Sequence, residues 1–87
     1  MMDQRKEPRH AAEGAVRVWF DNPEPFEIQG QLLDVSASGF RMAHECPTLQ
    51  AGQMVEFARE KAAGRARVIW NRISNAHVET GFLLVTS

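Results

Sequence analysis

The chain has 87 residues and a hydrophobic fraction of 44%, which is typical of one small globular domain. Its net charge of −1 lacks the basic surplus with which general nucleic-acid binders neutralise phosphates, so we expect no binding of DNA or RNA. No apolar run approaches the roughly 20 residues of a membrane span, and the polar N-terminus does not resemble a secretory signal. With one cysteine, Cys46, these features indicate a cytoplasmic protein that does not insert into a membrane.

The first half of the chain contains a charged leader and two strand patterns. Residues 1–13 show no alternation and many charges, which predicts a flexible N-terminal arm. Period-two alternation predicts strands at 15–20 (AVRVWF) and at 26–34 (FEIQGQLLD), separated by the turn-forming DNPEP. Gly30 falls on the apolar side of the second strand, which indicates a bulge or a sharp bend there.

The second half continues the pattern of short strands and turns. Residues 44–52 (HECPTLQAG) are predicted to form a loop, with one helical turn before Gly52. The alternation of apolar and polar residues predicts strands on either side of this loop, at 39–43 (GFRMA), 53–58 (QMVEFA), 64–72 (GRARVIWNR) and 77–85 (HVETGFLLV).

Six short strands without a sustained helical period predict an all-β protein with little helix. Open sheet edges are a hazard in so short a chain, so we expect residues 14–87 to close into a small six-stranded antiparallel β-barrel behind the arm at 1–13. On the predicted alternation, Trp70 lies on the inward face and fills the barrel. Trp19 lies on the outward face, where it covers an edge or a partner.

Metal-binding and catalytic patterns are poorly represented in the sequence. The soft ligands are His10, His44, Cys46 and His77, but no second pair with zinc-ligand spacing accompanies His44 and Cys46. We therefore interpret these four side chains as surface loop residues. No nucleophile elbow and no paired carboxylates are recognisable, so the sequence favours neither an enzyme nor a resident metal or cofactor.

The segment RKEPR, from Arg5 to Arg9, is the first of two stretches with chemical potential. Pro8 disfavours a helical conformation before it, and in an extended chain Arg5 and Arg9 project to the same side. Arginine donates two parallel hydrogen bonds to a phosphate, or to O6 and N7 of a guanine. Taken alone, such a segment is more often a solvated charged tail.

The second stretch is DVSASG, from Asp34 to Gly39, between two predicted strands. Asp34 and Ser36 can cap their own turn while Gly39 supplies an unusual φ and ψ. The same atoms can also face a ligand. The carboxylate accepts from N1–H and N2–H of a guanine, the hydroxyl donates or accepts, and the glycine lets a ligand approach the backbone.

Together, Arg-x-x-x-Arg and, about 25 residues later, Asp-x-Ser-x-x-Gly between two strands resemble the PilZ domain family. That family comprises small six-stranded antiparallel barrels that serve as bacterial receptors for cyclic di-GMP. Arg5 and Arg9 match the first motif, and Asp34, Ser36 and Gly39 match the second. The resemblance covers nearly the whole chain.

The resemblance implies a stand-alone receptor in bacterial second-messenger signalling. The two arginines would bind phosphate oxygens and one guanine edge, and Asp34 and Ser36 would bind guanine edges. The arm at 1–13 would become ordered on the barrel, and an effector protein, which the sequence does not identify, would read the change. The chain ends at Ser87, before the C-terminal helix that many members have, so we expect no oligomerisation or output through such a helix.

Two alternatives remain open. Some PilZ-like domains do not bind the nucleotide and act as protein-interaction adaptors, although these typically lack one of the two motifs. A nucleic-acid-binding barrel of the OB or Sm type is disfavoured by the near-neutral charge and by acidic residues on the outward faces.

Overall fold

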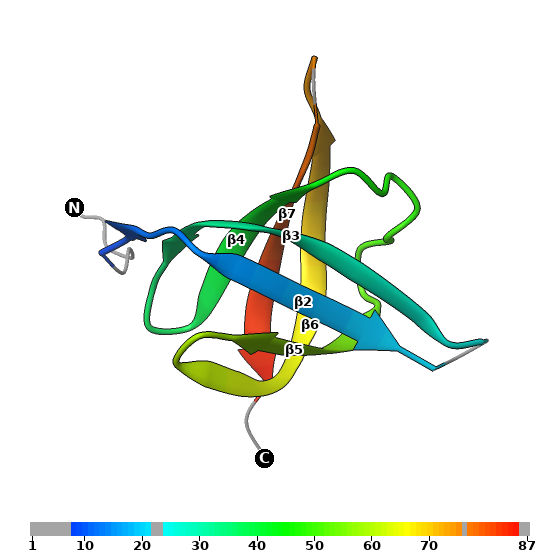
Figure 1. Cartoon of the computed structure of the whole chain (residues 1–87), viewed down its shortest axis with the longest axis horizontal. Coiled ribbons are helices and arrows are strands. Elements are labelled where there is room, and N and C mark those ends of the chain that lie inside the picture. Colours follow the sequence, from blue (N-terminus) through cyan, green and yellow to red (C-terminus); the bar gives the residue numbers. More distant parts are fainter. Residues whose placement is uncertain (1–7, 22–23, 76, 86–87) are drawn as a thin grey trace.

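The structure is a computed structural model and describes residues 8–21, 24–75 and 77–85, which contain strands and no helix. The sheet has the strand order β1-β3-β2-β5-β6-β7-β4, and β3 also pairs with β4. Six strands therefore close into an antiparallel barrel to which β1 is added at one end (Figure 1), which confirms the predicted fold. The strands are β1 (His10–Ala11), β2 (Ala15–Phe20), β3 (Phe26–Val35), β4 (Gly39–His44), β5 (Met54–Arg59), β6 (Ala62–Ile73) and β7 (Val78–Val85).

The core of the barrel consists of the inward-facing side chains that the alternation predicts on most strands. Three phenylalanines form its centre: the ring of Phe40 stacks on Phe82 with centroids 4.7 Å apart and tilts against Phe57 at 4.9 Å. Burial of an apolar side chain of this size stabilises a fold by about 1.5–3 kcal/mol. The buried aliphatic side chains around these rings are Val16, Val18, Ile28, Leu32, Met42, Leu49, Val55, Ala66 and Val68.

Gly30 allows two strands to approach each other closely. Of the predicted bulge or sharp bend, the bulge does not occur at this residue. The pairing of β2 with β3 runs without a shift through Val16 and Gly30. A Cβ atom on Gly30 would collide with the carbonyl oxygen of Ala43 in β4 and would lie 2.7 Å from Cε of Met42. The glycine is therefore needed where β3 packs closely against β4.

A bulge in β3 lies three residues further along the chain. Leu32 pairs with Met42 and Asp34 pairs with Arg41, so Leu33 is an extra residue in β3. An extra residue shifts the alternation of the strand by one position. As a result Asp34 faces outward beside Arg41, although unbroken alternation would place it inside with Leu32.

A second bulge overturns the prediction that Trp70 fills the barrel. Val68 pairs with Phe82 and Trp70 pairs with Gly81, which leaves Ile69 as the extra residue in β6. Trp70 is 37% exposed on the outer face, and its indole lies over Gly81, where a Cβ atom would be 2.5 Å from Nε1. The bulge shifts the alternation of β6 by one position, so that Asn71 pairs with the buried Thr80.

Trp19 lies on the outer side of β2, as predicted, where the guanidinium of Arg17 stands 4.9 Å from its ring centroid. The helical turn predicted before Gly52 is wrong. The segment between β4 and β5 contains turns only, and Gly52 has a φ of 93°. Leu49 from this segment is buried against the core, so the connection is packed although it has no regular structure.

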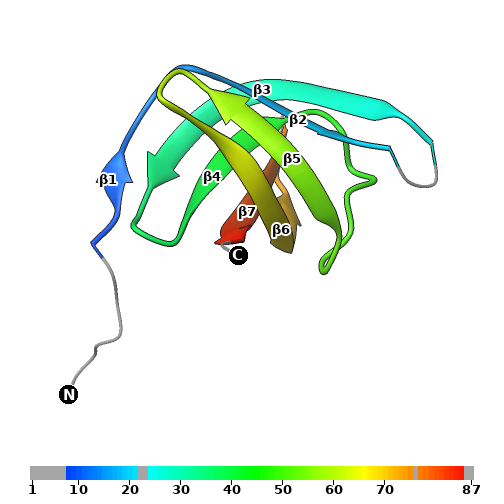
Figure 2. The same ribbon diagram turned by 90° about the horizontal axis from the view of Figure 1, so that it is seen from below.

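The sheet begins earlier than the predicted boundary at residue 14. His10 pairs with Val35 and Ala11 pairs with Asp34, so β1 lies beside the turn that joins β3 to β4 (Figure 2). Gly14, with a φ of 125°, makes the turn from β1 into β2. The end of the predicted arm is thus part of the sheet. Among the described residues, no helix has the length and apolar character required to cross a membrane.

Candidate functional site

Arg9, Asp34 and Arg41 form a cluster on the outer surface at the end of the barrel, which we call the Asp34 corner. Arg9 donates from Nε and Nη2 to Oδ1 of Asp34 at 3.1 and 3.0 Å. Arg41 donates from Nη2 to Oδ2 of Asp34 at 2.5 Å. Asp34 is 7% exposed, so a nearly buried carboxylate is neutralised by two guanidinium groups.

Local structure explains why these residues meet. The bulge at Leu33 turns Asp34 to the outer face, directly opposite Arg41 on β4. The pairing of Ala11 with Asp34 places the chain just before β1 against the same point of β3. Arg9, at the start of the neighbouring strand β1, therefore reaches the carboxylate, although 25 positions separate the two residues in the chain.

The electrostatic contacts continue from the corner along the outer face of β4, β7 and β6. Arg41 Nη1 lies 3.6 Å from Oε1 of Glu79. Glu79 also accepts from Nη2 of Arg72 at 3.0 Å and lies 3.3 Å from Nε2 of His77. These contacts, with the hydrogen bond from Arg72 as the largest cause, hold the pKa of Glu79 below its usual value.

Ser36 and Gly39 lie in the turn at the corner. The amide of Ser36 donates to the carbonyl oxygen of Gly39 at 2.9 Å. Gly39 does not have the positive φ that we expected of a turn glycine. It is instead buried, and a Cβ atom there would collide with the carbonyl oxygen of Phe82 on β7. Close packing of β4 on β7 thus requires a glycine at this position.

The structure brings together four of the five site residues that the sequence singles out: Arg9, Asp34, Ser36 and Gly39. The fifth, Arg5, lies outside the described residues. Arg41 is the residue that the sequence reasoning missed. The available signal was its place two residues after Gly39, because the second strand of a hairpin returns opposite the first.

His44 is buried, and the prediction that it is a surface loop residue is wrong. It is 3% exposed at the end of β4, where Nδ1 accepts from the amide of Cys46 at 3.1 Å. Its Nε2 therefore carries the proton and donates to Oγ1 of Thr80 at 2.6 Å. Burial, followed by the charge of His77, lowers the pKa of His44.

The chain of hydrogen bonds from His44 continues into the neighbouring strands. Thr80 donates to Oδ1 of Asn71 at 2.6 Å, and Nδ2 of Asn71 donates to the carbonyl oxygen of Leu49 at 2.5 Å. Both ring nitrogens of His44 are therefore hydrogen-bonded, and the chain of bonds links β4, β7 and β6 to the packed connection before β5. No group of three or more potential metal ligands occurs within residues 8–21, 24–75 and 77–85.

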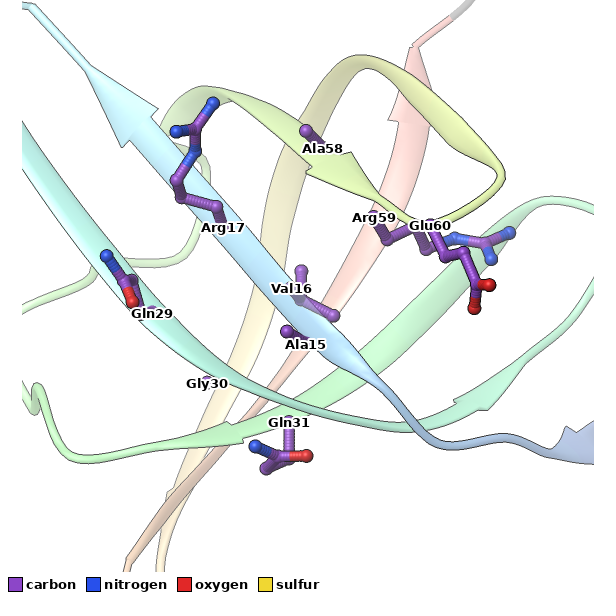
Figure 3. A pocket seen from close by; sticks show the side chains of 9 residues that line it. All are labelled: Ala15, Val16, Arg17, Gln29, Gly30, Gln31, Ala58, Arg59 and Glu60. Atoms are coloured by element: carbon purple, nitrogen blue, oxygen red, sulfur yellow. The ribbon is translucent and has the colours of Figure 1, made fainter.

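A shallow groove of about 660 Å³ lies away from the corner, on the outer surface of β2, β3 and β5 (Figure 3). Ala15 and Ala58 leave its floor open because their side chains are small. Arg17 at its edge is already engaged by the ring of Trp19 and by Glu27, whose Oε2 lies 3.6 Å from Nε. Arg59 and Glu60 also line the groove, but none of its lining residues is a buried carboxylate like Asp34.

No protein-family model and no curated protein matches the chain. The functional interpretation therefore depends on the chemistry of the corner. Two guanidinium groups surround one nearly buried carboxylate, and one of them belongs to the segment that enters the first strand. Such a set can bind an anion through its arginines and a paired N–H donor through its aspartate.

Proposed function

We propose that the protein is a PilZ-type receptor that binds cyclic di-GMP at the Asp34 corner. The contact between Arg9 and Asp34 carries this proposal. It joins the Arg-x-x-x-Arg segment to the Asp-x-Ser-x-x-Gly turn. Either stretch taken alone is weak evidence for a binding function. Cyclic di-GMP presents phosphates and guanine edges together, which is the combination that arginines and an aspartate at one corner can recognise.

An exchange of partners at Asp34 accounts for binding in physical terms. A guanine can donate N1–H and N2–H to the carboxylate in place of the two hydrogen bonds from Arg9. Arg9 is then released to bind a phosphate oxygen, or O6 and N7 of a guanine. Arg5 would act with it from the preceding part of the arm, and Ser36 would contact the ligand from the turn. The exchange keeps the number of charge-assisted hydrogen bonds roughly constant.

The output of the receptor follows from the same exchange. Release of Arg9 from Asp34 would change the contact that this residue makes with the barrel, and we propose that a cytoplasmic effector protein reads this change. The proposed role is therefore binding and signalling rather than catalysis.

The test is calorimetric titration of the purified protein with cyclic di-GMP and with cyclic di-AMP. Asp34→Asn removes the charge and one acceptor oxygen, so we expect it to lower affinity for cyclic di-GMP much more than for the adenine analogue. Glu27→Gln is the matched control, because Glu27 is an exposed carboxylate paired with Arg17. Equal losses for the two ligands would contradict a guanine-reading role for Asp34.

A non-binding adaptor is the second candidate function. Both oxygens of Asp34 are engaged by arginines of the protein itself, and the need for Gly39 is explained by packing alone. These observations favour a corner that only stabilises the fold. A folded sample that shows no heat of binding with cyclic di-GMP would establish this alternative over the receptor.

A further inference from the structure

The two arginines of the Asp34 corner are held by the backbone in different ways. Arg41 lies within β4, where it pairs with Asp34 on β3 and with Gly81 on β7. Arg9 precedes β1, which has only two residues and, among the described strands, pairs with β3 alone. The side chain of Arg41 is 32% exposed and that of Arg9 is 49% exposed. The backbone of Arg41 is thus held by a paired strand on each side, whereas the strand that follows Arg9 is paired on one side.

The hydrogen bonds at the carboxylate divide in the same way. Among the described residues, Arg41 is the one that donates to Oδ2, at 2.5 Å, and its other terminal nitrogen lies 3.6 Å from Glu79. Arg9 directs both of its hydrogen bonds to Oδ1. Loss of Arg9 would free one oxygen of Asp34 and leave the other on Arg41, so the carboxylate would keep a positive partner and a fixed orientation.

Arg41 also carries a cost that a stabilising surface residue would not have. Its Nε is buried without a hydrogen-bond partner in the described part of the chain. A buried donor left unpaired destabilises a fold, and well-packed apolar residues often stabilise as well as a buried ion pair does. Fold stability alone therefore gives a weak reason for an arginine here, and its effect on Asp34 gives a stronger one.

We infer that Arg41 is a positioning residue that holds the Asp34 carboxylate in place and oriented for guanine, while Arg9 is the partner that the ligand replaces. This inference rests on the proposed function for its ligand and assigns selectivity to a residue outside both sequence motifs. Arg41 acts through Asp34, so its loss should change which base is accepted as well as how tightly the ligand binds.

The experiment compares Arg41→Gln and Arg41→Lys with Arg72→Gln in titrations with cyclic di-GMP and cyclic di-AMP. Arg72 is the matched control, because it contacts the same Glu79 but does not contact Asp34. Urea unfolding of each variant verifies that the barrel is folded at the titration temperature.

Arg41→Gln is expected to lower affinity for cyclic di-GMP about tenfold and to bring its preference over cyclic di-AMP close to one. Arg41→Lys should retain part of the preference, because an ammonium group supplies the charge but lacks the planar fork. Arg72→Gln should weaken both ligands by the same small factor. Loss of affinity in Arg41→Gln with an unchanged preference would overturn the inference.

A second measurement separates this inference from the proposed function. Double-mutant cycles measured by urea unfolding give the coupling free energy between Asp34 and each arginine. The variants are Asp34→Asn, Arg41→Gln and Arg9→Gln. We expect the larger coupling for Arg41, whether or not the protein binds cyclic di-GMP. If the wild-type protein does not bind cyclic di-GMP, the proposed function is wrong, but the comparison of the two coupling energies still tests the role of Arg41. A coupling for Arg41 no larger than that for Arg9 would contradict its fixed, positioning role.

Discussion

Arg9 donates two hydrogen bonds to one carboxylate oxygen of Asp34, although 25 positions separate the two residues in the chain. The contact exists because β1 pairs with the end of β3 and because the bulge at Leu33 turns Asp34 outward. It places the charged leader and the polar turn at one corner of the barrel.

Replacement of Arg9 by alanine is expected to lower affinity for cyclic di-GMP at least tenfold, because a good arginine contact to a base contributes about 1–3 kcal/mol. The free energy of unfolding should change by about 1 kcal/mol or less, since half-exposed ion pairs contribute little and Asp34 keeps Arg41. Calorimetry and urea unfolding measure the two effects. Arg17→Ala is the control, because this exposed arginine pairs with Glu27. Similar affinities for the two variants would exclude Arg9 from the site.

Gly39→Ala is expected to destabilise the barrel by about 1–3 kcal/mol, because the new methyl group would collide with the backbone carbonyl of Phe82. Gly64→Ala is the matched control. The atom nearest to its new Cβ is Cε1 of Phe57, at the ordinary contact distance of 3.6 Å. Thermal unfolding should show a clear loss for the first variant and little change or a small gain for the second. Equal melting temperatures would mean that the strands can separate to accommodate a side chain.

Stability is expected to fall on mild acidification because of His44. Its pKa is lowered in the folded protein, so the unfolded chain binds the proton more readily. The stabilising effect is complete above the ordinary value of 6.5 and is lost as pH falls from there toward the lower pKa of the folded state. Urea unfolding across this pH range measures the loss. In His44→Gln the slope should be smaller, and an undiminished slope would show that another group is responsible.

Glu79 should produce a second loss of stability at more acid pH. Its pKa is lowered in the fold by Arg72 and His77, so its contribution is complete above the ordinary value of 4.5. The contribution is lost as pH falls through the folded-state pKa. Unfolding of Glu79→Gln in this acid range should depend less on pH than that of the wild type. The same dependence in both proteins would mean that the contacts with Arg72 and His77 are too weak in solution to matter.

The strands and the barrel were predictable because alternation is a local property of the sequence. The pattern in AVRVWF places Val16 and Val18 inside, and the structure buries both. Alternation fails where an extra residue enters a strand. Ile69 moves Trp70 from the predicted interior to the outer face, and nothing in GRARVIWNR marks that residue as the bulge.

The candidate site was predictable in part, and its missing elements depend on contacts between distant strands. Arg9 and Asp34 were identified from their motifs, whereas Arg41 becomes evident only when the register of β3 and β4 is known. Gly39 was assigned an unusual backbone conformation. Its actual requirement, the close approach of Phe82, comes from a strand more than 40 positions away and leaves no local signal.

The most direct measurement is a map of backbone amide shifts by NMR while the protein is titrated with cyclic di-GMP. Binding at the Asp34 corner predicts the largest changes at Arg9 to Ala11, at Asp34 to Gly39 and at Arg41, with few changes along the groove near Ala15 and Ala58. Changes centred on that groove, or a spectrum that stays constant at saturating nucleotide, would contradict the account.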